Sequence, residues 1–348
     1  MAQLRTLNAI ESLSGKTVLL RIDSDVDIDK DKIVDATRLE ASIDTIRLIL
    51  HKGGDINIIG HLGRPEGVDK KFTLEPVAHW FAGKLDGNAK PIKVGNLDGW
   101  KITDSVNLIE NIRFFPEEEK NDAEFSRELA LLGDVYVNDA FAVSHREHAS
   151  IFGVAKFIPS YAGLHLKQEI EVLGKILKDP KRPMAILIGG AKIETKLPLV
   201  EKMHHVADYV LVGGEIAEQD KVLIKVQHEK ITGRKSAVIV SESTPDGFDI
   251  DSKSVENFCQ ILNLAETIVW NGPVGVTGKG SESERGTKAL AECIVKTRAY
   301  RVVGGGDTLA SLKTANLLEK FDFVSTGGGA MLEFLSGKKL PGIAALER

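Results

Sequence analysis

Short apolar runs rich in valine, isoleucine and leucine alternate with longer amphipathic segments along the whole chain of 348 residues. Several of these runs have no polar face, which is typical of strands in a parallel sheet covered on both sides. Leucine and valine recur at spacings of three and four in the segments between them, which predicts helices that include 37–52, 125–133 and 194–207. The alternation predicts an α/β fold with doubly wound, Rossmann-like parallel sheets. Strands are expected at 17–23, 56–60, 106–110, 135–139, 184–190, 209–214, 267–272, 301–306 and 323–329.

One long helical segment, residues 162–180, contains no strand-like run and is bracketed by Pro159 and Pro180. It predicts a helix that connects two domains, residues 1–161 and 181–336, with a cleft between them. The length of the chain also fits two domains of ordinary size.

Composition narrows the class of protein. With 43% hydrophobic and 27% charged residues, the chain lies outside the disordered, fibrous and membrane classes. The formal net charge of -5 provides no general attraction for nucleic acid or anionic lipid, so neither is expected as a partner and any anion site must be local. The chain shows no apolar targeting segment, and its two cysteines, Cys259 and Cys293, are expected to be buried free thiols, which predicts a cytoplasmic protein.

The residues that follow the expected strands differ between the two halves of the chain. Because ligands bind beyond the carboxyl ends of the strands in such sheets, these residues are the candidates for function. The first half carries charged and imidazole groups there: Asp23, His61, Arg64, Arg113, His145, Arg146 and His148. The second half carries glycine loops: GGAK (189–192), GGE (213–215), NGPVG (271–275), GGGDT (304–308) and STGGGA (325–330).

Glycine loops that lead into helices aim backbone N–H groups and the helix dipole at an anion. One such loop is explained by turn geometry alone, but several in one half favour a polyphosphate site. Lys192 and Lys196 follow one loop a helical turn apart; they can contact phosphates, or they can be ordinary solvated lysines. Asp307 can cap its helix or bind Mg²⁺ beside phosphates.

The arginines of the first half suggest a second kind of site. Arginine side chains hold carboxylates and phosphates bidentately. Each one taken singly is most simply a surface or ion-paired residue, but together they favour a pocket for a small, multiply charged anion. The histidines lack zinc-site spacing. A polyphosphate site and a polyanion site on two domains predict phosphoryl transfer in a closed, water-free cleft, hence a kinase of a small acid. The arginines concerned are Arg21, Arg38, Arg64, Arg113 and Arg146.

Seven motifs carry a resemblance to a known family, and they lie in family order over most of the chain. Together they are highly specific, and the chain resembles the phosphoglycerate kinases. The motifs are GHLGRP (60–65), LIENIRF (108–114), YVNDAFAVSHREHAS (136–150), AILIGGAK (185–192), VWNGPVGV (269–276), VVGGGDT (302–308) and STGGGAMLEFLSGKKLPGIAAL (325–346).

The resemblance implies reversible transfer of the γ-phosphoryl group of ATP to the carboxylate of 3-phosphoglycerate, a step of glycolysis and gluconeogenesis, by a hinge-bending monomer. Segment 337–348 would complete the acceptor domain, residues 1–161. The acceptor would bind through Asp23, Asp25, Arg38, His61, Arg64, Arg113 and Arg146. ATP or ADP with Mg²⁺ would bind the second domain through Gly190, Lys192, Lys196, Asn271, Pro273, Gly304, Gly305, Gly306, Asp307 and Thr308.

Within these sets the resemblance implies particular roles. Arg38 and Lys192 would stabilise the transferring phosphoryl group, together with the loops at Gly305 and Gly328. Asp307 would hold Mg²⁺. The acceptor carboxylate, with a pKa near ~4, is already ionised and needs no general base.

The sequence departs from the family pattern in three places. RIDSDVD puts Asp25 where RxDxNVP has asparagine, beside the expected anion site. GVTG puts Gly278 where GVFE has a ribose-contacting glutamate, and Glu282 and Glu284 are the candidates to replace it. The stretch 215–267 is short for the family, which predicts weaker contacts to the base and a looser choice of nucleotide.

Two other classes of function stay open at this stage. A non-catalytic binding protein on the same scaffold is suggested by the short stretch, but such a scaffold would not need Arg38, Lys192, Lys196 and Asp307 together. A nicotinamide-dependent dehydrogenase is suggested by GGGDT, but the third glycine of the dinucleotide fingerprint is missing.

Overall fold

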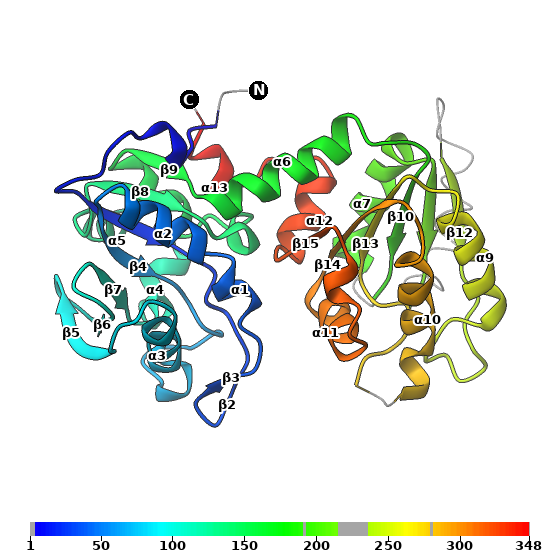
Figure 1. Cartoon of the computed structure of the whole chain (residues 1–348), viewed down its shortest axis with the longest axis horizontal. Helices are drawn as coiled ribbons and strands as arrows, with labels where there is room; N and C mark the ends of the chain where they lie inside the picture. The colour runs from blue at the N-terminus through cyan, green and yellow to red at the C-terminus, as the bar shows by residue number, and fades with distance from the viewer. Residues whose placement is uncertain (1–3, 191–192, 215–235, 279–280, 348) are drawn as a thin grey trace. The chain divides into compact units, whose positions relative to one another are not determined.

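The computed structural model describes residues 4–190, 193–214, 236–278 and 281–347 (Figure 1). The chain divides into two compact units, residues 1–170 with 339–348 and residues 171–338. The division falls inside helix α6, Leu164–Lys178. None of the described helices is both long and apolar enough to cross a membrane.

The first unit contains a seven-stranded sheet. Its strands are β1 (Thr17–Arg21), β4 (Asp55–Ile59), β5 (Lys90–Val94), β6 (Leu97–Lys101), β7 (Val106–Ile109), β8 (Val135–Asn138) and β9 (Ser160–Ala162). They are ordered β5-β6-β7-β4-β1-β8-β9. All pairs are parallel except the two made by β6, which pairs antiparallel with β5 and β7. The strand order reverses beside the central β1, so a ligand crevice is expected at its carboxyl end.

Helices cover this sheet, and a small hairpin, β2 (Ile28–Asp29) and β3 (Lys32–Ile33), stands apart from it. The core is formed by strand side chains such as Leu20 and Ile58, which pack with Ile46 and Phe81 from two of the helices. The helices are α1 (Thr37–Glu40), α2 (Ile43–His51), α3 (Glu75–Lys84), α4 (Pro116–Glu119), α5 (Ala123–Ala130) and α13 (Pro341–Ala344).

The second unit contains a six-stranded sheet in which every pair is parallel. Its strands are β10 (Met184–Ile188), β11 (Tyr209–Val212), β12 (Ala237–Val240), β13 (Thr267–Asn271), β14 (Tyr300–Gly304) and β15 (Phe323–Ser325). The order is β12-β11-β10-β13-β14-β15. The direction of winding reverses between β10 and β13, which are adjacent, so the loops after these two strands flank the expected crevice.

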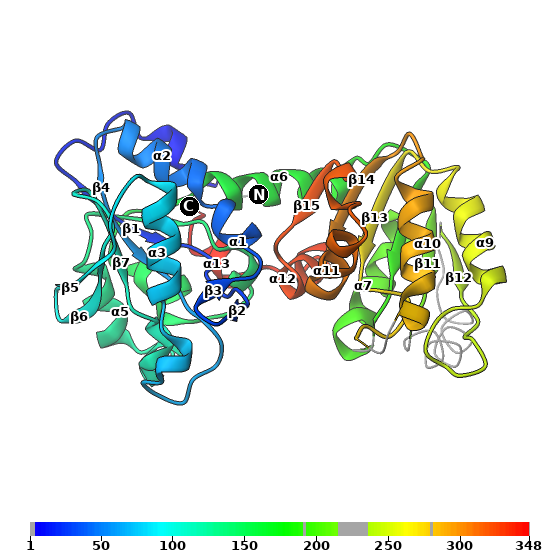
Figure 2. The ribbon, with the colours of Figure 1, turned by 60° about the horizontal axis from the view of Figure 1, so that its bottom comes forward.

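Helices lie on both faces of the second sheet, as Figures 1 and 2 show. On one face Phe258, Leu290 and Leu312 pack with Trp270 of β13. These side chains come from helices α9 (Ser252–Leu262), α10 (Arg285–Ile294) and α11 (Gly306–Thr314). The other face is covered by α7 (Ile193–Val206) and α12 (Gly329–Leu335).

The α/β class and the parallel sheets predicted from the sequence are confirmed. Each of the nine predicted strands is present, and all nine end one to four residues before the predicted boundary. In all but β1, a glycine or a polar residue begins the loop there. The helix predicted at 37–52 is two helices, since Ser42 Oγ donates to the carbonyl of Leu39 at 2.7 Å and interrupts the helix. Cys259 and Cys293 are free, as predicted, but half-buried rather than buried.

Candidate active site

The carboxyl ends of β1, β4 and β8 lie level with one another in the first unit, because Arg21 is opposite both Ile59 and Asn138. The loop after β1 carries Asp23 and Asp25, and the loop after β4 carries His61. Ser24 Oγ donates to the carbonyl of His61 at 2.8 Å and joins the two loops. The parallel register therefore brings together side chains that are about forty residues apart in the sequence.

Arg38, on α1, is held by the two aspartates of the first loop. Its Nε lies 3.4 Å from Oδ2 of Asp23, and its Nη1 donates to the carbonyl of Asp25 at 2.8 Å. The Asp25 carboxylate accepts from the backbone N–H of Gly63 at 2.8 Å and lies 3.9 Å from Nη1 of Arg38. Arg38 is 32% exposed, so part of the fixed guanidinium stays open to a ligand.

Arg113 reaches the same place from the loop after β7. Asn111 caps the short helix Ile112–Phe114 and so orients the backbone there. The guanidinium of Arg113 donates to the carbonyl of Gly63 at 2.5 Å and lies 3.3 Å from Glu119. Arg146 is half-buried after the turn Phe141–Val143, and its charge reaches Arg113 and His61. Arg64 follows Gly63 with an exposed side chain.

The charged side chains around His61 shift one another's pKa values. Burial, helped by Arg146 and Arg21, lowers the pKa of Arg113 to about 10. Burial and the surrounding arginines hold the pKa of His61 well below its usual value, so the imidazole is neutral near pH 7. Burial raises the pKa of Asp23, against the opposing charge of Arg38. The site thus combines several fixed cations with a neutral imidazole, which suits a small anion with more than one charged group.

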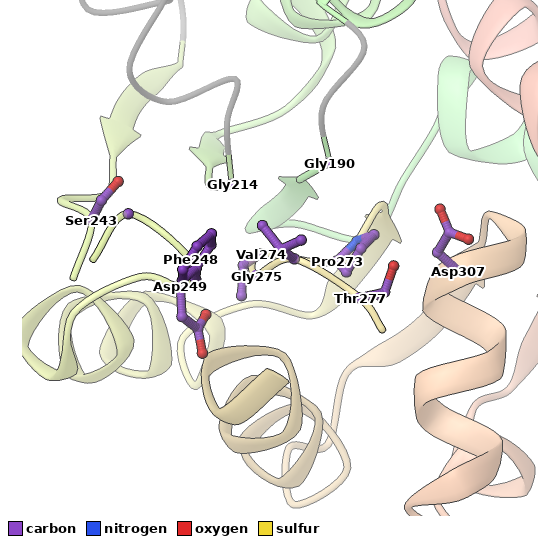
Figure 3. Close-up of a pocket in the computed structure, with 12 residues that line it drawn as sticks. Gly190, Gly214, Ser243, Phe248, Asp249, Pro273, Val274, Gly275, Thr277 and Asp307 are labelled. Atoms are coloured by element: carbon purple, nitrogen blue, oxygen red, sulfur yellow. The ribbon is translucent and has the colours of Figure 1, made fainter. Parts of the chain in front are cut away.

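A pocket in the second unit lies at the carboxyl ends of β10, β11 and β13. Figure 3 shows Asp307 at one end of it and Ser243 and Phe248 at the other, with Pro273 and Val274 between them. Glycines form much of the remaining wall: Gly190, Gly214, Gly247 and Gly275. Side chains are thus small at the strand ends, and backbone groups are accessible to a ligand.

The loop between β14 and α11 has the geometry of an anion-binding turn. Gly305 has a φ of +99°, a conformation that glycine adopts without strain, and α11 begins directly after it. Thr308 is fully buried, and its Oγ1 accepts from the N–H of Gly272 at 2.9 Å. Asn271 is buried beside the same turn. The hydroxyl of Thr308 therefore joins the two glycine loops, and the side chain of Asn271 lies beside them.

The remaining residues predicted for the nucleotide site are distributed as follows. Gly304 ends β14, Gly306 begins α11, and Gly328, with a φ of +44°, precedes α12. Pro273 lines the pocket. Lys192 lies outside the described residues, as does the side chain of Lys196 on α7.

Asp307 is the exposed carboxylate of this pocket, whereas Asp249 accepts from the backbone N–H groups of Ile250 and Gly286. Asp307 lies in the first turn of α11 and points into the pocket end shown in Figure 3. Among the described residues no cluster of three or more His, Cys, Asp or Glu side chains could hold a metal by itself. One carboxylate oxygen is sufficient for Mg²⁺ that arrives with phosphate ligands, so Asp307 fits the ion.

The hydrogen bonds around Gly278 identify the glutamate that lies beside it. Glu284 Oε1 accepts from the N–H of Gly278 at 3.1 Å, and Oε2 lies 3.4 Å from Ser311 Oγ on α11. Glu282 instead forms an ion pair with Arg285 at the surface. This hydrogen bond from Gly278, whose φ is +79°, places the Glu284 carboxylate beside that position.

Two side chains behind the charged group around His61, Glu118 and Ser150, were not singled out from the sequence. Both are completely buried and bonded to each other. Glu118 lies in a run of three glutamates, PEEEK, and only its burial distinguishes it from Glu117 and Glu119. No signal in the sequence alone identifies it.

The fold and these two sites define a two-unit α/β phosphotransferase. Comparison with known families identifies it further: the family model described as phosphoglycerate kinase matches residues 7–237 and 218–338. The chain belongs to the phosphoglycerate kinase family. This membership favours a kinase over the binding-protein and dehydrogenase alternatives.

Individual relatives are similar to this chain along almost its whole length. The phosphoglycerate kinase of Dictyoglomus turgidum is 38% identical over 388 aligned positions, with 97% of each chain covered. That of Desulforudis audaxviator is 39% identical over 386 positions, with 96% of this chain and 97% of the relative covered. Both alignments are longer than this chain, so they contain gaps in it.

Solved structures give the same result. The structure of phosphoglycerate kinase from Coxiella burnetii has a TM-score of 0.82 and 31% identity, with 99% of both chains covered. The phosphoglycerate kinase of Pyrococcus horikoshii has a TM-score of 0.81 and 27% identity, covering 99% of this chain and 98% of the other.

Proposed function

We propose that the protein catalyses the reversible reaction of ATP with 3-phosphoglycerate that gives ADP and 1,3-bisphosphoglycerate. The observation that carries this proposal is the arginine group around His61, which provides for a small polyanion in one unit, while the other unit has a glycine pocket ending in Asp307. The first unit would then be the acceptor domain and the second the nucleotide-binding domain. We also propose a cytoplasmic monomer whose units close by hinge bending.

For this reaction the protein needs only to align the two substrates and to neutralise the charge of the transferring group. The acceptor carboxylate is ionised at pH 7, so its oxygen attacks the γ-phosphorus with no proton to remove. Arg38, fixed by Asp23 and Asp25, would neutralise the transferring oxygens on the acceptor side. Lys192 and the amides around Gly305 and Gly328 would do so on the nucleotide side. Mg²⁺ held by Asp307 would supply charge neutralisation at the ATP phosphates.

An initial-rate assay tests the function. Turnover should require the protein, ATP, 3-phosphoglycerate and Mg²⁺ together, with the product reduced by a coupling dehydrogenase that consumes NADH. GTP in place of ATP tests the expected loose choice of nucleotide, which a strong preference for ATP would contradict. Absence of turnover with both nucleotides, from a folded protein, would contradict the kinase and favour a binding protein.

Replacing Asp25 by asparagine is expected to tighten the acceptor site. Asparagine keeps an oxygen that can accept from Gly63, but it removes a negative charge beside Arg38 and His61. One unit charge at about 4 Å in a water-like medium is worth about 1 kcal/mol, so the KM for 3-phosphoglycerate should fall about fivefold. Initial rates at several salt concentrations check this, because the difference should shrink as salt screens the charge.

Asp27→Asn is the matched control, since it makes the same charge change at an exposed position in the same loop. It should leave the KM unchanged. A large fall in kcat for Asp25→Asn would instead give the Asp25 carboxylate a role of its own.

Glu284 is proposed as the nucleotide-contacting glutamate that Gly278 cannot supply. Glu284→Gln should raise the KM for ATP about tenfold, because a hydrogen bond to a charged acceptor contributes about 1.5 kcal/mol. The KM for 3-phosphoglycerate should not change. Glu282→Gln is the control, since that side chain pairs with Arg285. Equal effects from both variants would disprove the assignment.

A further inference from the structure

A continuous line of buried side chains lies behind the charged group around His61. Glu118 accepts two hydrogen bonds from Ser150, at 2.8 Å from the backbone N–H and at 2.7 Å from the hydroxyl. Ser150 Oγ in turn accepts from Nε of Arg21 at 2.9 Å. Nη2 of Arg21 lies 3.1 Å from Nδ1 of His61. All four side chains are 0–1% exposed, so water does not compete for these bonds.

The chemistry of the two ends fixes the direction of every bond in this line. A carboxylate only accepts and a guanidinium only donates. Ser150 has one hydroxyl proton, which goes to Glu118, so its lone pair is left for Arg21. Burial opposes ionisation of Glu118, but hydrogen bonds from His148 and Ser150 and the charge of Arg21 hold its pKa below the usual value. Glu118 is therefore an acceptor throughout the neutral range.

The consequence reaches the imidazole of His61. Because Arg21 can only donate, Nδ1 of His61 must accept and cannot carry a proton. The single ring proton is then on Nε2. That atom faces the substrate side of the group, where it lies 3.8 Å from Oδ2 of Asp25. The ring thus offers an N–H donor toward the site where the acceptor is proposed to bind.

We propose that Glu118 and Ser150 are positioning residues which, through Arg21, hold His61 as the Nε2–H tautomer and so give the acceptor site a neutral donor. The positioning of the ring rests on geometry alone. Its value for binding rests on the proposed function, because a fixed N–H donor is useful to an anionic oxygen of the substrate. A bond that the protein has oriented beforehand costs less ordering when the substrate binds.

Tyr136 offers a control variant that disturbs the packing around Ser150 but leaves the line of hydrogen bonds intact. The hydroxyl of Tyr136 donates to the carbonyl of Ser150 at 2.7 Å, so it belongs to the same buried cluster. It takes no part in the line from Glu118 to His61. Tyr136→Phe therefore removes a buried hydrogen bond next to Ser150 without changing the partner of Arg21.

The first measurement is the tautomer of His61, read from the nitrogen shifts of its ring in long-range ¹H–¹⁵N spectra at pH 7 without substrate, with His61→Gln to assign the signals. The protein should show a protonated Nε2 and a bare Nδ1. Ser150→Ala, which frees Nε of Arg21, should give mixed tautomers, and so should Arg21→Lys, which keeps the charge but loses the fork. Tyr136→Phe should give the spectrum of the unchanged protein.

Kinetics give the second readout. Ser150→Ala should raise the KM for 3-phosphoglycerate about tenfold and leave the KM for ATP unchanged, as expected for a weakened charge-assisted contact. Tyr136→Phe should leave both constants unchanged. A protonated Nδ1 in the unchanged protein would overturn the proposal even if no variant folded, as would equal effects from Ser150→Ala and Tyr136→Phe. The expected tautomer without any turnover would leave the positioning intact and contradict the kinase instead.

Discussion

Arg38→Ala is expected to lower kcat by about 10²–10³-fold, because it removes the donor that we propose neutralises the transferring group on the acceptor side. The contacts of Arg38 with Asp23 and with the carbonyl of Asp25 fix the guanidinium before any substrate arrives. The alanine variant also leaves two carboxyl groups beside the anion site without their cation. Initial rates at saturating ATP and 3-phosphoglycerate measure the effect.

Two further arginine variants separate charge from geometry. Arg38→Lys keeps the charge but not the planar guanidinium, so its kcat should lie between that of the unchanged protein and that of Arg38→Ala. Arg47→Ala, on α2, removes a guanidinium that is 64% exposed and pairs only loosely, at 3.9 Å, with Asp44. It should leave kcat unchanged. A kcat for Arg38→Ala equal to that of the unchanged protein would exclude Arg38 from the transfer step.

Asp307→Asn is expected to have the second largest effect, by weakening the binding of Mg²⁺ at the pocket. Its carboxylate is exposed at the pocket end in the first turn of α11 and is free to bind an ion brought by the nucleotide. An amide is a poorer ligand for a hard cation, so the Mg²⁺ concentration for half-maximal rate should rise about 10–100-fold. Titration of the rate with Mg²⁺ at fixed ATP measures the shift.

The competing explanation for Asp307 is stabilisation of the helix dipole, which is worth only about 0.3–1 kcal/mol. Glu75→Gln provides the matched control, because Glu75 is an exposed acid in the first turn of α3. Both variants should lose a similar, small amount of stability in thermal unfolding. Only Asp307→Asn should change the dependence on Mg²⁺; an unchanged titration would leave Asp307 as a helix-terminal residue.

The strands were predictable because their apolar runs are short, rich in valine and isoleucine, and end in glycine or charged residues. β5 and β6 were missed. KPIKV is an edge strand with two lysines and a proline in which only Val94 is buried. LDGWK buries Gly99 and Trp100 but has no run of apolar residues to signal a strand. The helix break at Ser42 was also missed. It depends on one hydroxyl bonding back to Leu39, which periodicity does not register.

The candidate site was predictable for those residues that directly follow a parallel strand. Parallel pairing brings Asp23, His61 and Arg113 to one edge of a sheet, so their sequence positions were enough. Glu118 could not be found in this way, because nothing local separates it from the glutamates on either side. The choice of Glu284 over Glu282 likewise depended on a hydrogen bond from the backbone N–H of Gly278, which the sequence does not reveal.

The most direct test of the central claim is to follow the γ-phosphoryl group itself. The protein is incubated with γ-labelled ATP, Mg²⁺ and 3-phosphoglycerate, and hydroxylamine is added to trap an acyl phosphate as its hydroxamate. Hydroxylamine displaces the labelled phosphate from the acyl phosphate, so we expect hydroxamate, ADP and labelled phosphate in equal amounts. All three should form only when 3-phosphoglycerate is present, at a rate that collapses in Arg38→Ala. Labelled inorganic phosphate released at the same rate with and without 3-phosphoglycerate, and no hydroxamate, would contradict the account.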